Sequence, residues 1–202
     1  MYRFFFIVML SVFPGTAFTQ NTALVIVDIQ SAYFDGGASP LVNPEEASME
    51  AAKILDHFRN TGQLVVHVQH NAAAPGLIIF QDDTANMRIH EYVFPVNGEP
   101  VITKAFPNSF RATSLDSLLS EHGIKQLVIC GMMTHMCIDA TVRAAKGFGY
   151  DITLIEDACA TKDIQWDTKN IPADKVHEVF VAALNGYYAK VIAAEEWLKK
   201  YD

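Results

Sequence analysis

The chain has 202 residues, of which 50% are hydrophobic, and a formal net charge of −8 at pH 7. This length fits one domain of ordinary size, and the composition is sufficient for a sizeable core. The acidic balance and the lack of any basic run argue against a nucleic-acid partner, because neutralising phosphates requires clustered lysine and arginine.

The first 20 residues have the order of a secretory signal peptide. A basic start, MYR, is followed by the apolar run FFFIVMLSVF and by small residues in PGTAFTQ. The run is too short for a membrane-spanning helix, which needs about 20 residues. We therefore predict a signal peptide over 1–20, a mature domain over 21–202, and a periplasmic or secreted protein without membrane contact after cleavage. The alternative is an apolar first strand in a cytoplasmic protein.

In the first half of the mature chain, two apolar segments rich in β-branched residues predict strands, over 23–30 and 63–70. Their nearly continuous apolarity is typical of strands buried on both faces, as in a parallel sheet. Between them, 44–62 has the proline, acids and final glycine of a helix. The segment 71–110 contains four prolines and little periodicity, which is typical of a functional loop.

The second half continues the alternation. Helices are predicted over 114–123, 134–149 and 173–186 and around EEWLKK near the end; strands are predicted over 125–131 and 151–158, and a short apolar run, YAKVIAA, precedes the last helix. Thr134 is the expected N-cap of its helix. Strand–helix alternation of this kind predicts an α/β fold with right-handed crossovers.

Three reactive side chains follow predicted strands: Asp28 follows LVIV, Lys104 follows VIT, and Cys137 lies just beyond LVICG. In open α/β sheets ligands bind beyond the carboxyl ends of the strands, so the three are expected to converge. Each has another interpretation: Asp28 as a loop cap, Lys104 as a solvated lysine, Cys137 as core filler. The first turn of a helix would, however, lower the pKa of the Cys137 thiol.

The sequence lacks the motifs of several other kinds of site. The three cysteines, an odd number, have no disulfide-framework spacing, so at least one thiol should be free, and Cys130 is interpreted as core. No glycine-rich nucleotide motif and no G-x-S-x-G elbow is present. The histidines form no H-E-x-x-H pattern. We therefore predict neither a metal nor a cofactor.

Four segments in this order resemble the isochorismatase-like cysteine hydrolases of the nicotinamidase/isochorismatase superfamily: ALVIVDIQ, KAFPNSF, GMMTHMCIDATVRAA and DACAT. The resemblance covers about residues 22–198. It implies a three-layer, Rossmann-like fold with a mainly parallel sheet of about six strands flanked by helices. It also implies a homo-oligomer, either a dimer or a tetramer.

The resemblance also implies roles for site residues. Asp28 would be the general base, Lys104 its cationic partner and Cys137 the nucleophile. A cis peptide bond would join Met132 and Met133. The backbone N–H groups of Met133 and Cys137 would form an oxyanion hole.

Departures within the family guide the expected reaction. True isochorismatases cleave a vinyl ether and lack the cysteine, so Cys137 favours cleavage of a C–N bond. Nicotinamidases carry an Asp/His metal site after the first strand, where this chain has SAYFDGGASP without histidine. We expect metal-independent hydrolysis of a small-molecule amide through a thioester, with release of ammonia or an amine. A vinyl-ether hydrolase and a non-catalytic secreted ligand-binding protein are the alternatives.

The substrate pocket is expected to include the 71–95 loop and several aromatic and polar side chains beside the three reactive groups. Those side chains are Gln30, Tyr33, Phe34, His70, Phe106, Asn108, Phe110 and Thr134.

Overall fold

The computed structural model describes residues 21–71 and 85–201. The predicted signal peptide and residues 72–84 of the predicted substrate loop lie outside the described residues. Within the described ranges, no helix is long and apolar enough to cross a membrane.

A six-stranded parallel sheet forms the centre of the fold, in the order β3-β2-β1-β4-β5-β8. The strands are β1 (Thr22–Val27), β2 (Leu64–His70), β3 (Val101–Lys104), β4 (Gln126–Met132), β5 (Asp151–Ala160) and β8 (Lys190–Ile192). Every residue of β1 is buried, as its continuous apolarity requires in a sheet covered on both faces. The predicted α/β fold with about six strands is confirmed.

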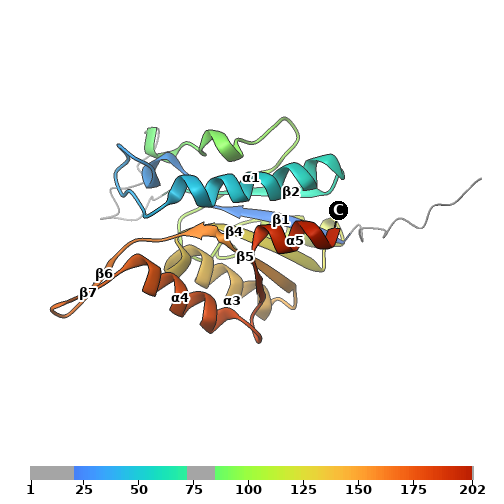
Figure 1. Cartoon of the computed structure of the whole chain (residues 1–202). Coiled ribbons are helices and arrows are strands. Elements are labelled where there is room, and N and C mark those ends of the chain that lie inside the picture. The colour runs from blue at the N-terminus through green and yellow to red at the C-terminus, as the bar shows by residue number, and fades with distance from the viewer. Residues whose placement is uncertain (1–20, 72–84, 202) are drawn as a thin grey trace, which may run out of the picture.

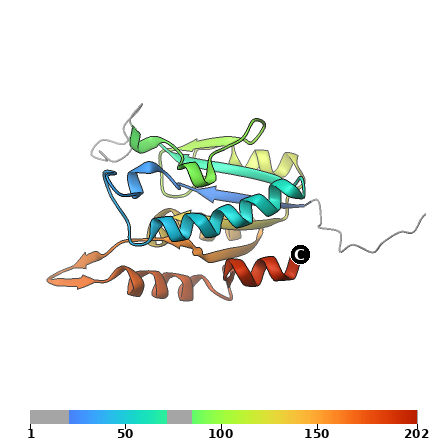
Figure 2. The same ribbon diagram turned by 45° about the horizontal axis from the view of Figure 1, so that its top comes forward.

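Helices cover both faces of the sheet (Figure 1). One face carries α1 (Pro44–Asn60) and α5 (Ala194–Tyr201), which lie next to each other in Figure 2. Phe58 of α1 stacks on Trp197 of α5. The other face carries α2 (Leu115–Glu121), α3 (Asp139–Gly147) and α4 (Ala173–Leu184). The sheet thus separates two apolar cores, one beneath each layer of helices.

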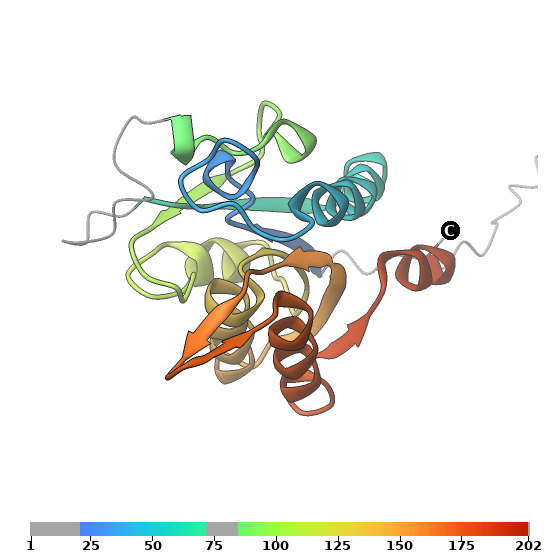
Figure 3. The ribbon, with the colours of Figure 1, turned by 60° about the vertical axis from the view of Figure 1, so that its left-hand side comes forward.

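Short elements complete the chain. There are 3-10 turns over η1 (Ser31–Tyr33), η2 (Ala85–Met87) and η3 (Glu91–Val93), and a π-helical turn over η4 (Thr134–Ile138). The antiparallel hairpin of β6 (Ile164–Trp166) and β7 (Lys169–Ile171) was not predicted, and it projects from the body of the molecule (Figures 1 and 3).

Two predicted boundaries are wrong. The first strand ends at Val27 rather than at residue 30, because Asp28 adopts a left-handed backbone with φ 53°. Thr134 is not an N-cap, since no side chain caps the π-helical turn and the Thr134 hydroxyl bonds elsewhere. Both departures occur where the chain leaves the sheet.

The strand order changes direction between β1 and β4. From β1 the chain builds outward through β2 and β3, and from β4 it builds the other way through β5 and β8. Ligands bind at such a switch point, beyond the carboxyl ends of the strands. Gly131 lies opposite Val27 there with φ 131°, and a Cβ at this position would collide with the Val27 carbonyl. Glycine therefore lets the end of β4 lie close to the end of β1.

A partly buried ion-pair network links the middle of β2 to α1. Glu99 accepts a hydrogen bond from Arg59 Nε at 2.7 Å, and its other oxygen lies 2.8 Å from His67 Nε2. Burial by itself raises the pKa of Glu99, but Arg59, the Val96 N–H and His67 outweigh it and lower the pKa to about 2. Glu99 is therefore ionised throughout the neutral range.

Replacing Glu99 by glutamine is expected to lower the free energy of unfolding at pH 7 by about 1.5–3 kcal/mol, the range for hydrogen bonds to charged groups. The folded pKa of about 2 lies below the unfolded value of about 4.3, so this contribution is complete above the unfolded value and lost as the pH falls toward 2. Urea unfolding of both proteins between pH 3 and 7 checks this. A difference that does not change with pH would contradict it.

Candidate active site

Four buried side chains meet at the carboxyl edge of the sheet, with the Lys104 ammonium at their centre. Lys104 Nζ lies 2.6 Å from Asp28 Oδ2, 2.9 Å from His70 Nδ1 and 3.1 Å from Cys137 Sγ. All four residues are at most 5% exposed. The predicted convergence of Asp28, Lys104 and Cys137 therefore exists in the structure, and His70 joins them.

The sheet itself positions these groups. Asp28 follows β1, and its N–H donates to the Val68 carbonyl of the neighbouring strand at 2.9 Å. His70 and Lys104 are the last residues of β2 and β3 and face one another in register. Cys137 lies in the π-helical turn after β4. Figure 3 brings this edge of the sheet forward.

The charges of the cluster stabilise one another. Burial by itself raises the pKa of Asp28, but Lys104 and His70 outweigh it and the pKa is lowered. Burial by itself lowers the pKa of Lys104, but Asp28 and Cys137 outweigh it and the pKa is raised. The resting cluster therefore holds a carboxylate and an ammonium.

The Cys137 thiol departs from the sequence-based expectation. Its pKa is raised, first by burial and then by the negative charge of Asp28, and Lys104 only partly opposes this. The predicted lowering by the helix start is wrong, because a nearly inaccessible sulfur beside a carboxylate loses more from desolvation than it gains from backbone N–H groups. The resting thiol is neutral.

The peptide bond between Met132 and Met133 is cis, as the resemblance implied. The bond lies at the end of β4, directly before the turn that carries Cys137. The oxyanion-hole role of the Met133 and Cys137 N–H groups stays a prediction.

Asp28, His70 and Cys137 each offer a possible metal ligand, and their donor atoms lie within 4.8 Å of one another. The Lys104 ammonium, however, contacts all three of these residues and takes the position that a cation would need. The ammonium of Lys104 therefore already provides the positive charge beside these three possible ligands.

The predicted substrate contacts after β1 make contacts within the protein, and their contact with substrate stays a prediction. The Gln30 amide donates to the carbonyls of His70 and Met87 and accepts the His70 N–H, so it holds the end of β2. Tyr33 is buried, and burial together with Asp28 and Cys137 raises the pKa of its hydroxyl. Phe34 stacks on His90 with ring centroids 3.6 Å apart.

Of the predicted substrate contacts after β3, Phe106 touches the cluster, while Asn108 and Phe110 make other contacts. The Phe106 carbonyl accepts a hydrogen bond from Lys104 Nζ at 3.1 Å, so this loop touches the cluster. The Asn108 side chain accepts the Phe110 N–H. Phe110 is buried and packs on Phe148, just beyond the end of α3, and its contact with substrate stays a prediction.

Thr134 is fully buried beside the cluster, and its hydroxyl contacts the Ala160 carbonyl and His177. Sequence reasoning missed His177, which gives no signal within its helix. The ring of His70 contacts Lys104, a contact that sequence reasoning missed although its place at a strand end was an available signal. The predicted contact of His70 with substrate stays a prediction.

A doubly wound parallel sheet with ionisable groups gathered at its switch point is the architecture of an α/β enzyme. The Isochorismatase domain model matches residues 22–196, and the chain belongs to the isochorismatase family of hydrolases. The isochorismatase family protein YddQ of Bacillus subtilis is 52% identical over 180 residues, which cover 89% of this chain and 100% of that protein.

Two further comparisons agree. The crystal structure of a putative isochorismatase hydrolase from Oleispira antarctica is 40% identical, with a TM-score of 0.85, and the match covers 90% of this chain and 97% of that one. Streptothricin hydrolase of Streptomyces noursei is 37% identical over 149 residues, which cover 70% of this chain and 50% of that protein.

Proposed function

We propose that this protein is a cysteine amidohydrolase that cleaves the C–N bond of a small-molecule amide without a metal, through a thioester, and releases ammonia or an amine. The observation that carries the proposal is the buried contact of one ammonium, Lys104, with both the Asp28 carboxylate and the Cys137 thiol. The relative named streptothricin hydrolase supports hydrolysis as the class of reaction.

The electrostatics define the first step. The thiol is neutral at rest and Asp28 is ionised, so Asp28 can accept the thiol proton as the sulfur attacks the carbonyl carbon. Lys104 stays protonated and compensates the negative charge that moves from the carboxylate to the sulfur. The proton transfer and the attack are thus coupled, because a free thiolate is unfavourable in this buried site.

In the later steps, Asp28 passes on the proton that it took from the thiol. The tetrahedral oxyanion would accept hydrogen bonds from the predicted N–H donors of Met133 and Cys137, each worth about 2.7–4 kcal/mol. Asp28 returns its proton to the leaving nitrogen as the C–N bond breaks and the thioester forms. Water then attacks the thioester, Asp28 takes a proton from it, and the acid departs as the thiol is restored.

His70 orients the ammonium. Because Lys104 Nζ donates and His70 Nδ1 lies 2.9 Å away, Nδ1 must be the accepting nitrogen of that ring. The Phe106 carbonyl and Asp28 accept from the same ammonium. With Cys137 Sγ, the ammonium has four acceptors for its three N–H bonds, and these partners hold the cation beside the sulfur.

The proposal predicts that Cys137→Ala abolishes turnover. Wild-type protein is incubated with a panel of aromatic and aliphatic primary amides, and released ammonia is measured. The best amide is then tested on Cys137→Ala, which is expected to lose at least about 10³-fold of turnover because the nucleophile is gone. Cys159→Ala removes another buried thiol and is the matched control, expected to retain activity.

A thioester trapped on Cys137 and found by peptide mass would support the mechanism directly. Undiminished amide turnover in Cys137→Ala would overturn the role of Cys137 as the nucleophile, whereas a wild type that hydrolyses none of the amides would favour the vinyl-ether alternative. Export through residues 1–20 and assembly into a homo-oligomer stay predictions.

A further inference from the structure

The short segment between the cis peptide and Cys137 is held by side chains from distant parts of the chain. Thr134 is 0% exposed, and its Oγ1 lies 3.3 Å from the Ala160 carbonyl and 3.1 Å from His177 Nδ1. The next residue, His135, bonds through Nδ1 to the Thr161 hydroxyl at 2.5 Å. Residues at the end of β5 and on the helix α4 are therefore hydrogen-bonded to the start of the π-helical turn.

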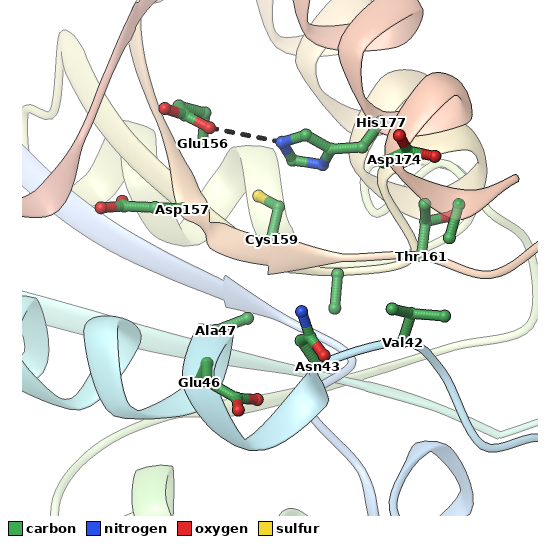
Figure 4. A pocket seen from close by; sticks show the side chains of 12 residues that line it. Val42, Asn43, Glu46, Ala47, Glu156, Asp157, Cys159, Thr161, Asp174 and His177 are labelled. Atoms are coloured by element: carbon green, nitrogen blue, oxygen red, sulfur yellow. Dashed lines mark hydrogen bonds and ion pairs between the residues drawn. The ribbon is translucent and has the colours of Figure 1, made fainter.

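His177 is itself held from its other side. Its Nε2 lies 3.3 Å from Glu156 Oε2 on β5, and Figure 4 shows this pair at the wall of a cavity between β5, α4 and the start of α1. The cavity has a volume of about 330 Å³. A chain of contacts thus runs from Glu156 through the His177 ring to Thr134, three residues before Cys137.

A hydroxyl, an imidazole and a carboxylate in sequence suggest a second nucleophile, but the burial of Thr134 argues against it. Its hydroxyl is inaccessible to any substrate and has partners on both sides. The hydrogen bonds between Glu156 and His177 and between His177 and Thr134 instead fit a structural role, which is to fix the position of Thr134.

The hydrogen bond between His177 and Thr134 can form in either protonation state of His177. When the ring is neutral with its proton on Nε2, that N–H donates to Glu156 and Nδ1 accepts the Thr134 hydroxyl proton. When the ring is protonated, Nδ1–H donates to Thr134 Oγ1 and the hydroxyl donates to the Ala160 carbonyl. The contact between Thr134 Oγ1 and His177 Nδ1 exists in both arrangements.

We propose that His177 is a positioning residue for Cys137. Its Nδ1 holds Thr134, and through Thr134 it fixes the turn that presents the thiol and the predicted N–H donors of Met133 and Cys137. The inference rests on the proposed function for its effect on turnover, whereas its effect on the order of the turn does not depend on any substrate.

Two conservative variants separate positioning from mere packing. An asparagine at 177 places its amide near the Nδ1 position and can still bond Thr134, while a glutamine reaches toward the Nε2 position and Glu156. His177→Asn and His177→Gln are compared with Thr134→Val, which removes the hydroxyl. Glu178→Gln, the neighbouring exposed position on α4, is the control.

Two readouts are measured on each folded variant: hydrogen–deuterium exchange of peptides spanning 133–138, and kcat and KM on the amide that the wild type hydrolyses best. We expect His177→Gln and Thr134→Val to exchange several-fold faster in this segment. Their kcat should fall by about 10- to 100-fold with little change in KM, as small displacements of reacting groups do. His177→Asn and Glu178→Gln should resemble the wild type.

Equal behaviour of the asparagine and glutamine variants in exchange would overturn the inference, because a packing role does not distinguish the two ring nitrogens. If the wild type hydrolyses no amide, only the proposed function fails, and the exchange measurement still decides the role of His177.

Discussion

An Asp28→Asn variant is expected to lose about 10²- to 10⁴-fold of turnover, the usual contribution of a general base, although its Cys137 thiol becomes easier to ionise. The Asp28 charge raises the pKa of that thiol, and asparagine removes the charge while keeping the shape. Lys104 then acts on the sulfur unopposed by a carboxylate. Ionisation of the thiol and catalysis should therefore change in opposite directions.

The thiol is followed by iodoacetamide alkylation of the folded protein between about pH 6 and 10, on either side of the reference thiol value near 8.5, with the adduct located by peptide mass. The midpoint for Cys137 should fall in Asp28→Asn relative to the wild type. Asp35→Asn, which removes an exposed carboxylate seven residues further along, is the control and should change neither readout. Turnover retained in Asp28→Asn, or a midpoint that rises, would refute the assignment of Asp28 as base.

The convergence of Asp28, Lys104 and Cys137 could be predicted because it depends only on topology. The carboxyl ends of parallel strands meet at one edge, and each residue follows an apolar run that can be identified in the sequence. The pKa direction of Cys137 could not be predicted in this way. It depends on how completely the sulfur is buried and on its distance from Asp28, which only the folded packing determines.

The same distinction explains the wrong cap. Thr134 has the sequence position of an N-cap, but its hydroxyl is committed to Ala160 and His177, which are 26 and 43 residues away. A pattern within a short window contains no information on such partners. The missed hairpin has a local reason, since five of the eight residues of IQWDTKNI are polar or charged and Trp166 is 74% exposed, so no buried face marks the strands.

Removing the cation from the cluster is expected to give the largest loss of stability. Lys104→Met leaves Asp28 buried without its ammonium, and breaking a buried pair in this way costs about 3–5 kcal/mol. In the wild type the lowered pKa of Asp28 makes its contribution complete above the unfolded value of about 3.9 and lost as the pH falls below it. In the variant, burial is no longer opposed by Lys104, so the folded pKa rises above the unfolded one.

The pH dependence of the stability of Lys104→Met follows from the raised folded pKa of Asp28. The variant is penalised while Asp28 is ionised, and protonation in the folded state relieves the penalty as the pH falls through the raised pKa. Its deficit in free energy of unfolding should be largest near pH 7 to 8 and should narrow toward about pH 4, close to the unfolded value of Asp28. Urea unfolding across this range measures it.

The double variant Asp28→Asn/Lys104→Met separates the lost pair from the lost lysine stem. With both charges gone, no unpaired ion remains, and most of the stability at pH 7 should return. If the double variant is no more stable than Lys104→Met, the cost lies in packing and Asp28 is not held ionised by the ammonium. The electrostatic basis of the proposed proton transfer would then be lost, because a carboxyl that is neutral at rest cannot accept the proton of Cys137.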